Sequence, residues 1–389
     1  MSTDRRTVVL AAATAGNFGQ FGARVVLSPL ILAIALDFQV TKGGVGTGLT
    51  LMWATVALAQ FPSGVLADRY GERPVMVAAL GLTALGSGLV AAAPTFPTFV
   101  LAAGALGTGA GLYFPVGTAL LARHFENRGR ALGIHSAGGP LAGLALPVAA
   151  TAIAARYGWR AGVITGGTLA AVACGLVLVG VEPTPPARPD ASVREHLHPR
   201  RALELLRQPA VAYTTVVATL GMYTFQAFTS FFPTFLREYH GLGESEASLV
   251  FGVAFFLVAV GLPIVGNAAD RFGNDAGLVG TFLGTAVGFA ILLLAPTRAL
   301  VYVGAAVVGL ALTWGGPLQS RFMSQFPAAD RASGFGVVRT VFVFLGSVSN
   351  VVTGVLAARV GWGAAYGVVV ALLLLAAALV VRNRNAQNE

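Results

Sequence analysis

Two ten-residue stretches decide the fold of this chain: GVLADRYGER at positions 64–73 and GNAADRFGND at positions 266–275. At an offset of 202 residues Gly64, Asp68, Arg69 and Gly71 match Gly266, Asp270, Arg271 and Gly273. Self-similarity at a fixed spacing indicates an internal duplication. We therefore expect the chain to consist of two related halves.

Further matches on either side of these stretches support the duplication. RALG at 130–133 matches RASG at 331–334, and ARYGW at 155–159 matches ARVGW at 358–362, at offsets of 201 and 203. Pro115 matches Pro317 at an offset of 202. Because these matches occur in the same order, the two halves are predicted to have the same, parallel topology.

The composition places this duplicated chain in a membrane. Of its 389 residues, 56% are hydrophobic and 11% are charged, and the mean hydropathy is +0.75. In soluble domains roughly a quarter of the residues are charged. A run of about 20 apolar residues is long enough to cross a bilayer as a helix. Twelve such runs are predicted, at 8–34, 45–66, 75–93, 97–121, 131–155, 161–181, 210–235, 246–268, 276–295, 299–320, 334–357 and 363–381.

Arginine and lysine in the loops predict the orientation, since cytoplasmic loops are enriched in both. With both termini in the cytoplasm, the inner side holds 17 of the 25 basic residues, the outer side 6, and the spans 2. We therefore predict a multi-pass protein of the cell (inner) membrane, with the lipid bilayer as its surroundings and no nucleic-acid partner. A proline-rich, charged linker at 182–208 separates a six-span bundle at 1–181 from another at 209–389.

The stretch at 64–73 lies between predicted spans 2 and 3 and resembles the signature loop of the major facilitator superfamily, Gly-x-x-x-Asp-Arg-x-Gly-x-Arg. The resemblance covers about residues 8–381. It implies an all-α membrane protein whose twelve transmembrane helices form two pseudo-symmetric six-helix bundles. It also implies secondary transport by alternating access around a site at the membrane midplane.

The residues of this loop are candidates for gating. Gly71 permits a tight turn, and Arg69 and Arg73 hold the loop at the cytoplasmic face. The resemblance implies that Asp68 meets the positive N-terminus of span 11 and latches the cytoplasmic side. By the repeat, Asp270 beside Arg271 would do the same at span 5. The alternative is that these residues only set the loop topology.

Two arginines lie inside predicted spans, Arg24 in the first and Arg339 in the eleventh. Ionisable residues within a membrane are costly and generally functional. No Asp or Glu lies in the middle of any predicted span, so an anionic substrate is the natural counter-charge for a guanidinium, which binds carboxylate or phosphate in bidentate fashion. The alternative is that Arg24 bonds backbone carbonyls and that Arg339 extends toward the interface.

A second resemblance agrees with an anionic substrate. HFENRGRALGIHSAGGPLAGLALP at 124–147, followed by RYGWR at 156–160, is similar to the span 4–5 region of monocarboxylate and oxalate/formate-type transporters. The acidic–glycine start of the monocarboxylate family's first span is absent, and GNFGQFGAR stands there instead. The resemblance implies small-molecule carboxylate transport.

Further candidates for the substrate site follow from the superfamily, in which spans 1, 4, 7 and 10 line the pathway. The polar and aromatic residues of these spans are Asn17, Gln20, Tyr113, Tyr223, Gln226 and Trp314. Gln226 matches Arg24 at an offset of 202. His135 in span 5 is a candidate for proton coupling, because its side chain titrates near neutral pH. Structural packing is the alternative for each.

Other function classes find less support. The sequence has no P-loop, no zinc-ligand spacing and no Ser–His–Asp set, so neither an enzyme nor a cofactor is predicted. A proton-driven exporter of hydrophobic compounds or drugs is the main alternative, since Gly139, Pro140 and Gly143 resemble part of the antiporter motif of drug exporters. A membrane sensor that kept the fold but does not transport is a further alternative.

Overall fold

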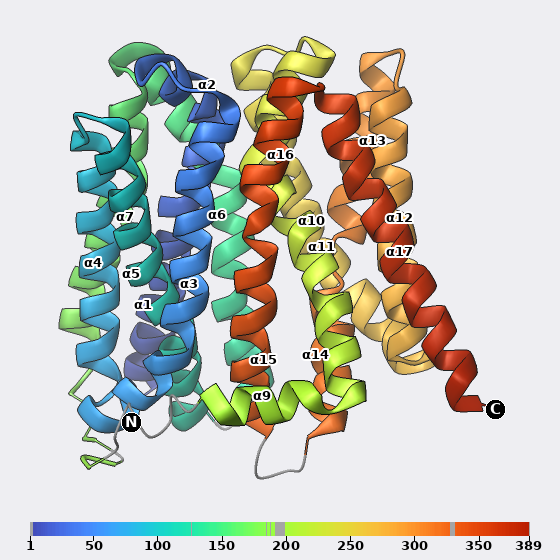
Figure 1. Cartoon of the computed structure of the whole chain (residues 1–389). Helices are drawn as coiled ribbons and strands as arrows, with labels where there is room; N and C mark the ends of the chain where they lie inside the picture. The colour runs from blue at the N-terminus through green and yellow to red at the C-terminus, as the bar shows by residue number, and fades with distance from the viewer. Residues whose placement is uncertain are drawn as a thin grey trace. The chain divides into compact units, whose positions relative to one another are not determined.

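A computed structural model describes residues 3–125, 127–183, 185–186, 188–190, 199–326 and 331–388. Throughout these ranges the regular structure is helical (Figure 1), which confirms the all-α prediction. The chain divides into two compact units, Met1–Phe38 with Thr47–His198, and Gln39–Gly46 with Pro199–Glu389. Of the predicted linker, residues 184, 187 and 191–198 lie outside the described ranges.

The helices follow the predicted spans closely. The bounds in the first half are α1 Thr3–Val25, α2 Leu27–Asp37, α3 Lys42–Tyr70, α4 Glu72–Ala92, α5 Phe96–His124, α6 Arg128–Tyr157 and α7 Trp159–Gly180. Those in the second half are α9 Pro199–Arg207, α10 Pro209–His240, α11 Glu244–Phe272, α12 Asn274–Leu294, α13 Arg298–Ala311, α14 Gly315–Gln325, α15 Arg331–Gly346, α16 Val348–Arg359 and α17 Trp362–Asn388.

Eleven helical segments within the described ranges are long and apolar enough to cross a membrane. The one remaining predicted span, 210–235, corresponds to α10. This helix has 32 residues and is therefore also long enough. Threonine, serine, tyrosine and glutamine along α10 lower its hydropathy, and most of them are buried inside the second unit. The polar face of this helix thus packs against protein and avoids lipid.

Three predicted spans are each broken into two helices. Span 8–34 is interrupted at Val26 and span 299–320 at Leu312–Trp314. In both cases a proline follows, Pro29 or Pro317, and a proline ring clashes with the carbonyl four residues before it. Span 334–357 is interrupted at Ser347, whose hydroxyl donates to the Phe344 carbonyl at 2.6 Å. A side chain bonded into the helical ladder in this way bends a helix.

The duplication is visible in the backbone. Gly71 and Gly273 have φ of 86° and 90°, and Gly158 and Gly361 have φ of 83° and 112°. These four glycines occupy matching positions in the two halves, and each separates two consecutive helices. A left-handed backbone favours glycine at a tight turn, so the motif glycines are retained for their conformation.

Glycines bring helices into close contact in both units, for example at Gly107 in the first and Gly309 in the second, and the second unit adds a cluster of phenylalanines. In the first unit helices approach through glycine: a Cβ on Gly107 would lie 2.1 Å from the Met52 carbonyl oxygen, and one on Gly86 would lie 2.5 Å from the Leu106 nitrogen. In the second unit, phenylalanines of α10 and α11 form the core, with Phe228 and Phe232 centroids 4.9 Å apart. Small residues permit close helix contact in membranes, whereas aromatic rings fill a wider interhelical space.

One short segment of the first half clusters with the second unit. Lys42, at the start of α3, forms an ion pair with Glu238 of α10 and lies 5.4 Å from the ring centroid of Trp362 in α17. The Trp362 indole nitrogen donates to the same Glu238 carboxylate at 2.7 Å. Together with the close approach of Gly46 to the Asn350 carbonyl oxygen of α16, these side chains connect Gln39–Gly46 to the second unit.

We predict that Gly107→Ala destabilises the protein, because the added methyl group would overlap the backbone of α3 at Met52. Overpacking of this kind costs about 1–3 kcal/mol. Gly88→Ala is the matched control, since a Cβ there meets nothing within 4 Å and alanine has the higher helix propensity. Thermal unfolding in detergent would measure both variants. Equal melting temperatures for the two would contradict the backbone contact.

Candidate functional site

Three polar residues form a line along α1. Asn17, Gln20 and Arg24 are three and four residues apart, which places them on one face of a helix, and all three are buried. The Gln20 amide donates to the Asn17 side-chain oxygen at 2.7 Å, and an Arg24 guanidinium nitrogen donates to the Gln20 side-chain oxygen at 2.9 Å. The sequence prediction grouped these three residues, and the structure connects them in one hydrogen-bond chain.

The Arg24 guanidinium lies where α1 ends. It is in the last turn of α1, two residues before the break at Val26, and the C-terminal end of a helix favours a cation. The guanidinium carbon lies 4.7 Å from the ring centroid of Trp53 and 5.2 Å from that of Phe21. Aromatic faces attract a cation most strongly when it is desolvated. The guanidinium is therefore held in one place within the first unit.

Tyr113 and His135 converge on one backbone carbonyl of α1. The Tyr113 hydroxyl donates to the Ala13 oxygen at 2.8 Å, and the His135 Nδ1 lies 3.1 Å from the same oxygen. Since a carbonyl only accepts, Nδ1 carries the proton and Nε2 has the lone pair. Both side chains are fully buried. Gly16 admits Tyr113, because a Cβ there would lie 1.9 Å from its hydroxyl oxygen.

His135 is also connected to the polar line of α1. The Asn17 amide donates to the His135 backbone oxygen at 2.8 Å. Within the residues that the structure describes, the buried His135 Nε2 has no hydrogen-bond partner, and the ring stacks on Phe114 at 5.4 Å. The imidazole is therefore a buried proton acceptor, and its residue is joined through Asn17 to the hydrogen-bond chain that ends at Arg24.

Gln226 belongs to a second polar network, in the second unit. Its amide donates to the Val343 carbonyl oxygen at 3.2 Å, and the Asn350 amide donates to the Gln226 side-chain oxygen at 3.0 Å. The Ser230 hydroxyl donates to the Asn350 side-chain oxygen at 2.5 Å. Sequence reasoning found Gln226 but missed Ser230 and Asn350. The four-residue spacing of Gln226 and Ser230 on α10 was an available signal.

Trp314 and Arg339 come together near this second network. The Trp314 ring is buried against Gly221 of α10 and contacts Phe342 of α15 at 6.4 Å. Arg339, which is half-buried, precedes Phe342 and Val343 by three and four residues, so the three share one face of α15. The structure thus brings Arg339, Trp314 and Gln226 to one region of the second unit. Tyr223 is also on α10, and its hydroxyl is buried.

The break before α14 adds exposed backbone to this region. Gly315 and Gly316 form the first turn of α14 and are exposed, and a Cβ on either would meet nothing within 4 Å. The first backbone N–H groups of a helix have no partner within the helix and favour an anion. Broken helices of this kind form ion and substrate sites in many transporters. The sequence TWGGP at 313–317 was a signal that sequence reasoning did not use.

The predicted gating residues lie at the α3–α4 and α11–α12 turns. Asp68 is 3.7 Å from Arg123 of α5 in the same unit, Arg73 donates to the Leu178 carbonyl, and Arg69 lies over the Tyr70 ring at 5.3 Å. In the second unit Asp270 and Arg271 are both exposed. The contact of Asp68 with the start of span 11 stays a prediction, as does the contact of Asp270 with the start of span 5.

Sequence reasoning missed the ion pairs that hold the helices beside these turns. Arg123 of α5 lies 2.9 Å from Glu72, which begins α4. In the second unit Arg321 of α14 pairs with Asp275 in the first turn of α12, and its Nε donates to Thr214 at 3.2 Å. Each unit therefore connects its third span to its fourth through one arginine. The partners are acidic residues just after the motif glycines, which a search of mid-span positions overlooks.

We predict that Arg321→Met lowers the free energy of unfolding by about 2 kcal/mol, because it leaves the largely buried Asp275 carboxylate without its cation. Arg298→Met is the matched control. Its side chain is 65% exposed and 3.7 Å from Glu246, and exposed ion pairs contribute at most about 1 kcal/mol. Thermal unfolding in detergent would compare the two variants. An equal loss of stability in both would show that the Arg321–Asp275 pair contributes no more than an exposed ion pair.

Comparisons with known proteins agree with this architecture. Residues 13–243 and 222–389 match the sequence profile of the Major Facilitator Superfamily. The chain is 26% identical to the nitrite extrusion protein of Bacillus subtilis, over 79% of this chain and 76% of that protein. It is 30% identical to human monocarboxylate transporter 11, over 95% and 74%, and 26% identical to the multidrug resistance protein MdtL of Escherichia coli, over 56% and 55%.

Solved structures show the same fold. A bacterial homolog of the human lysosomal transporter Spinster, in an inward-facing and occupied conformation, superposes with a TM-score of 0.84 at 16% identity, covering 99% of this chain and 98% of that one. The predicted fold is confirmed, as is the absence of an enzymatic family, since the matching family and relatives are transporters. The chain belongs to the Major Facilitator Superfamily of membrane transporters.

Proposed function

We propose that this transporter moves a small organic anion, most simply a carboxylate, by alternating access and that Arg24 binds the anion. The observation that carries the proposal is the position of Arg24 near the middle of the membrane-spanning segment Arg5–Asp37. A cation at that depth is costly and is retained where it has a function. A guanidinium also suits the planar, bidentate recognition of a carboxylate.

The surroundings of Arg24 support a binding role. Two hydrogen bonds to Gln20, one to its side chain at 2.9 Å and one to its backbone oxygen at 3.3 Å, orient the guanidinium. Trp53 and Phe21 supply apolar walls on which it rests. Binding groups that are held in place before the ligand arrives lose little entropy on binding. Asn17 and Gln20 extend the same polar line and are the proposed neighbours of the substrate.

The second unit offers a further cationic element. Arg339 shares a helix face with residues that contact Trp314 and Gln226, and α14 begins with exposed backbone at Gly315. Each of these features favours negative charge. Two relatives are named for anions, nitrite and monocarboxylates. These similarities favour an anionic substrate over a neutral or cationic one.

His135 is the proposed proton-coupling residue. Its unprotonated Nε2 is buried, and its Nδ1 is fixed by the Ala13 carbonyl. Tyr113 is the titratable side chain that faces it, at 6.3 Å between ring centroids. Protonation at Nε2 would add a positive charge close to the Asn17–Gln20–Arg24 line and thereby strengthen the attraction for an anion. With such a link the anion binds more tightly on the side of the membrane where the pH is lower, and a pH gradient therefore drives its transport away from that side.

We predict that Arg24→Gln weakens anion binding about 10- to 100-fold, because a charge-assisted hydrogen bond contributes roughly 1.5–3 kcal/mol. Lactate, succinate, phosphate, nitrite, glucose and tetraphenylphosphonium would be tested for thermal stabilisation of the purified protein, since a ligand of the folded state raises its stability. Arg298→Gln, an identical exchange at an exposed site, is the control and should respond like the parent. Arg24→Lys should retain part of the binding.

The same panel separates this proposal from drug efflux. The similarity to MdtL over 56% of the chain is the observation that favours an exporter of hydrophobic compounds. Stabilisation by tetraphenylphosphonium alone, with Arg24→Gln responding as the parent does, would contradict the anion proposal and support the exporter. Anion stabilisation that is lost in Arg24→Gln would exclude the exporter as the main activity.

We predict that His135→Gln abolishes uptake driven by a pH gradient into proteoliposomes but retains exchange of the anion at equal pH. Glutamine keeps an N–H that can donate to the Ala13 carbonyl, so the packing of the site is preserved, but it has no ring nitrogen that can take up a proton. Uptake of a radiolabelled anion from the panel would be compared with counterflow. Gradient-driven uptake that persists at the parental rate in His135→Gln would exclude this residue as the proton carrier.

A further inference from the structure

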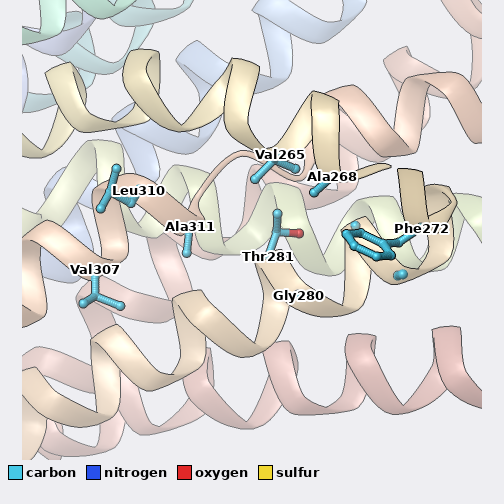
Figure 2. A pocket seen from close by; sticks show the side chains of 10 residues that line it. Val265, Ala268, Phe272, Gly280, Thr281, Val307, Leu310 and Ala311 are labelled. Atoms are coloured by element: carbon cyan, nitrogen blue, oxygen red, sulfur yellow. The ribbon is translucent and has the colours of Figure 1, made fainter. Parts of the chain in front are cut away.

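An open apolar groove lies in the second unit. It has a volume of about 370 Å³ and is lined by α11, α12 and α13. Figure 2 shows Phe272 at one end, Gly280 and Thr281 in the middle, and Leu310 and Val307 at the other end. The groove therefore follows the helices from the α11–α12 turn toward the interior of the membrane.

Small residues create this groove. A Cβ on Gly280 would meet nothing within 4 Å, and Ala268 faces it from α11. The repeat makes the cause clear, because Ala268, Gly277 and Gly280 match the larger Leu66, Val75 and Ala78 of the first half at an offset of 202. The smaller side chains in the second half leave room for the groove at this place.

The groove offers nothing for a polar ligand to bind. Apart from backbone, its polar lining group is Thr281, whose hydroxyl donates to the Leu278 carbonyl oxygen of its own helix at 2.9 Å. Around the groove the surface is apolar, with Phe272 73% exposed and Ile264 58% exposed. The segments Glu244–Phe272, Asn274–Leu294 and Arg298–Gln325, which include the lining residues, are long and apolar enough to cross a membrane, and an exposed apolar surface on such helices suits contact with lipid.

We propose that the groove holds an acyl chain of a membrane phospholipid, from the leaflet at the α11–α12 turn. The shape follows the helix axes as an acyl chain does, and the lining is apolar along its length. Arg271 is exposed directly beside Phe272 at the end of α11, where a long cationic side chain reaches the interface. The Arg271 guanidinium is the proposed partner for the phosphate of the same lipid.

The test uses the full-length protein in liposomes of phosphatidylethanolamine and phosphatidylglycerol. A trace of phospholipid carries a diazirine in one acyl chain, and mass spectrometry maps the adducts after irradiation. We expect adducts on the α11 and α12 peptides that line the groove to exceed those on α7, where Val179 is 91% exposed to the surroundings, by at least fivefold. Equal labelling of groove and α7 would overturn the proposal.

Gly280→Leu should fill the groove without a clash and lower the groove adducts at least fivefold, with α7 labelling unchanged. Gly266→Leu is the matched control, because a Cβ there also meets nothing within 4 Å and Gly266 lies outside the lining. Groove labelling that survives Gly280→Leu would overturn the proposal.

Discussion

Backbone hydrogen bonding within the membrane is the constraint on which the rest of the structure depends. Each peptide group inside a bilayer must find its partner within the protein, so any interruption of a helix there requires a substitute. The three interruptions observed here occur at Val26, at Leu312–Trp314 and at Ser347. They coincide with the polar side chains of the candidate site. The proposed binding groups therefore lie beside the breaks, where polar side chains can bond the backbone, as Asn350 does by donating to the Ser347 carbonyl oxygen.

The same constraint explains where the polar networks lie. Asn17 and Gln226 each donate to a backbone carbonyl of another helix, at His135 and Val343, and the network of Gln226 continues to Asn350, which follows the Ser347 break. Polar residues of a membrane protein face the bundle interior, where protein supplies partners. These contacts therefore fix the helices that carry the candidate binding groups relative to their neighbours within each unit.

Much of the fold was predictable from the sequence, because span length and internal repeats depend on local composition. The twelve predicted spans correspond to the helices, and the motif glycines Gly71 and Gly273 adopt the expected turns. The site was less accessible. Asn350 and the ion pairs of Arg123 and Arg321 depend on which helix faces are adjacent, and single-helix patterns do not contain that information.

The close glycine crossings have a consequence for how the two halves can change. Gly107 brings backbone against backbone in the first unit, and Gly309 does the same in the second, where a Cβ would lie 2.5 Å from the Ala254 carbonyl oxygen. A backbone contact cannot be relieved by a change of rotamer, whereas the rings around Phe228 can tilt and repack. Sequence drift should therefore be tolerated more readily in the ring cluster of α10 and α11 than at the glycine crossings of either half.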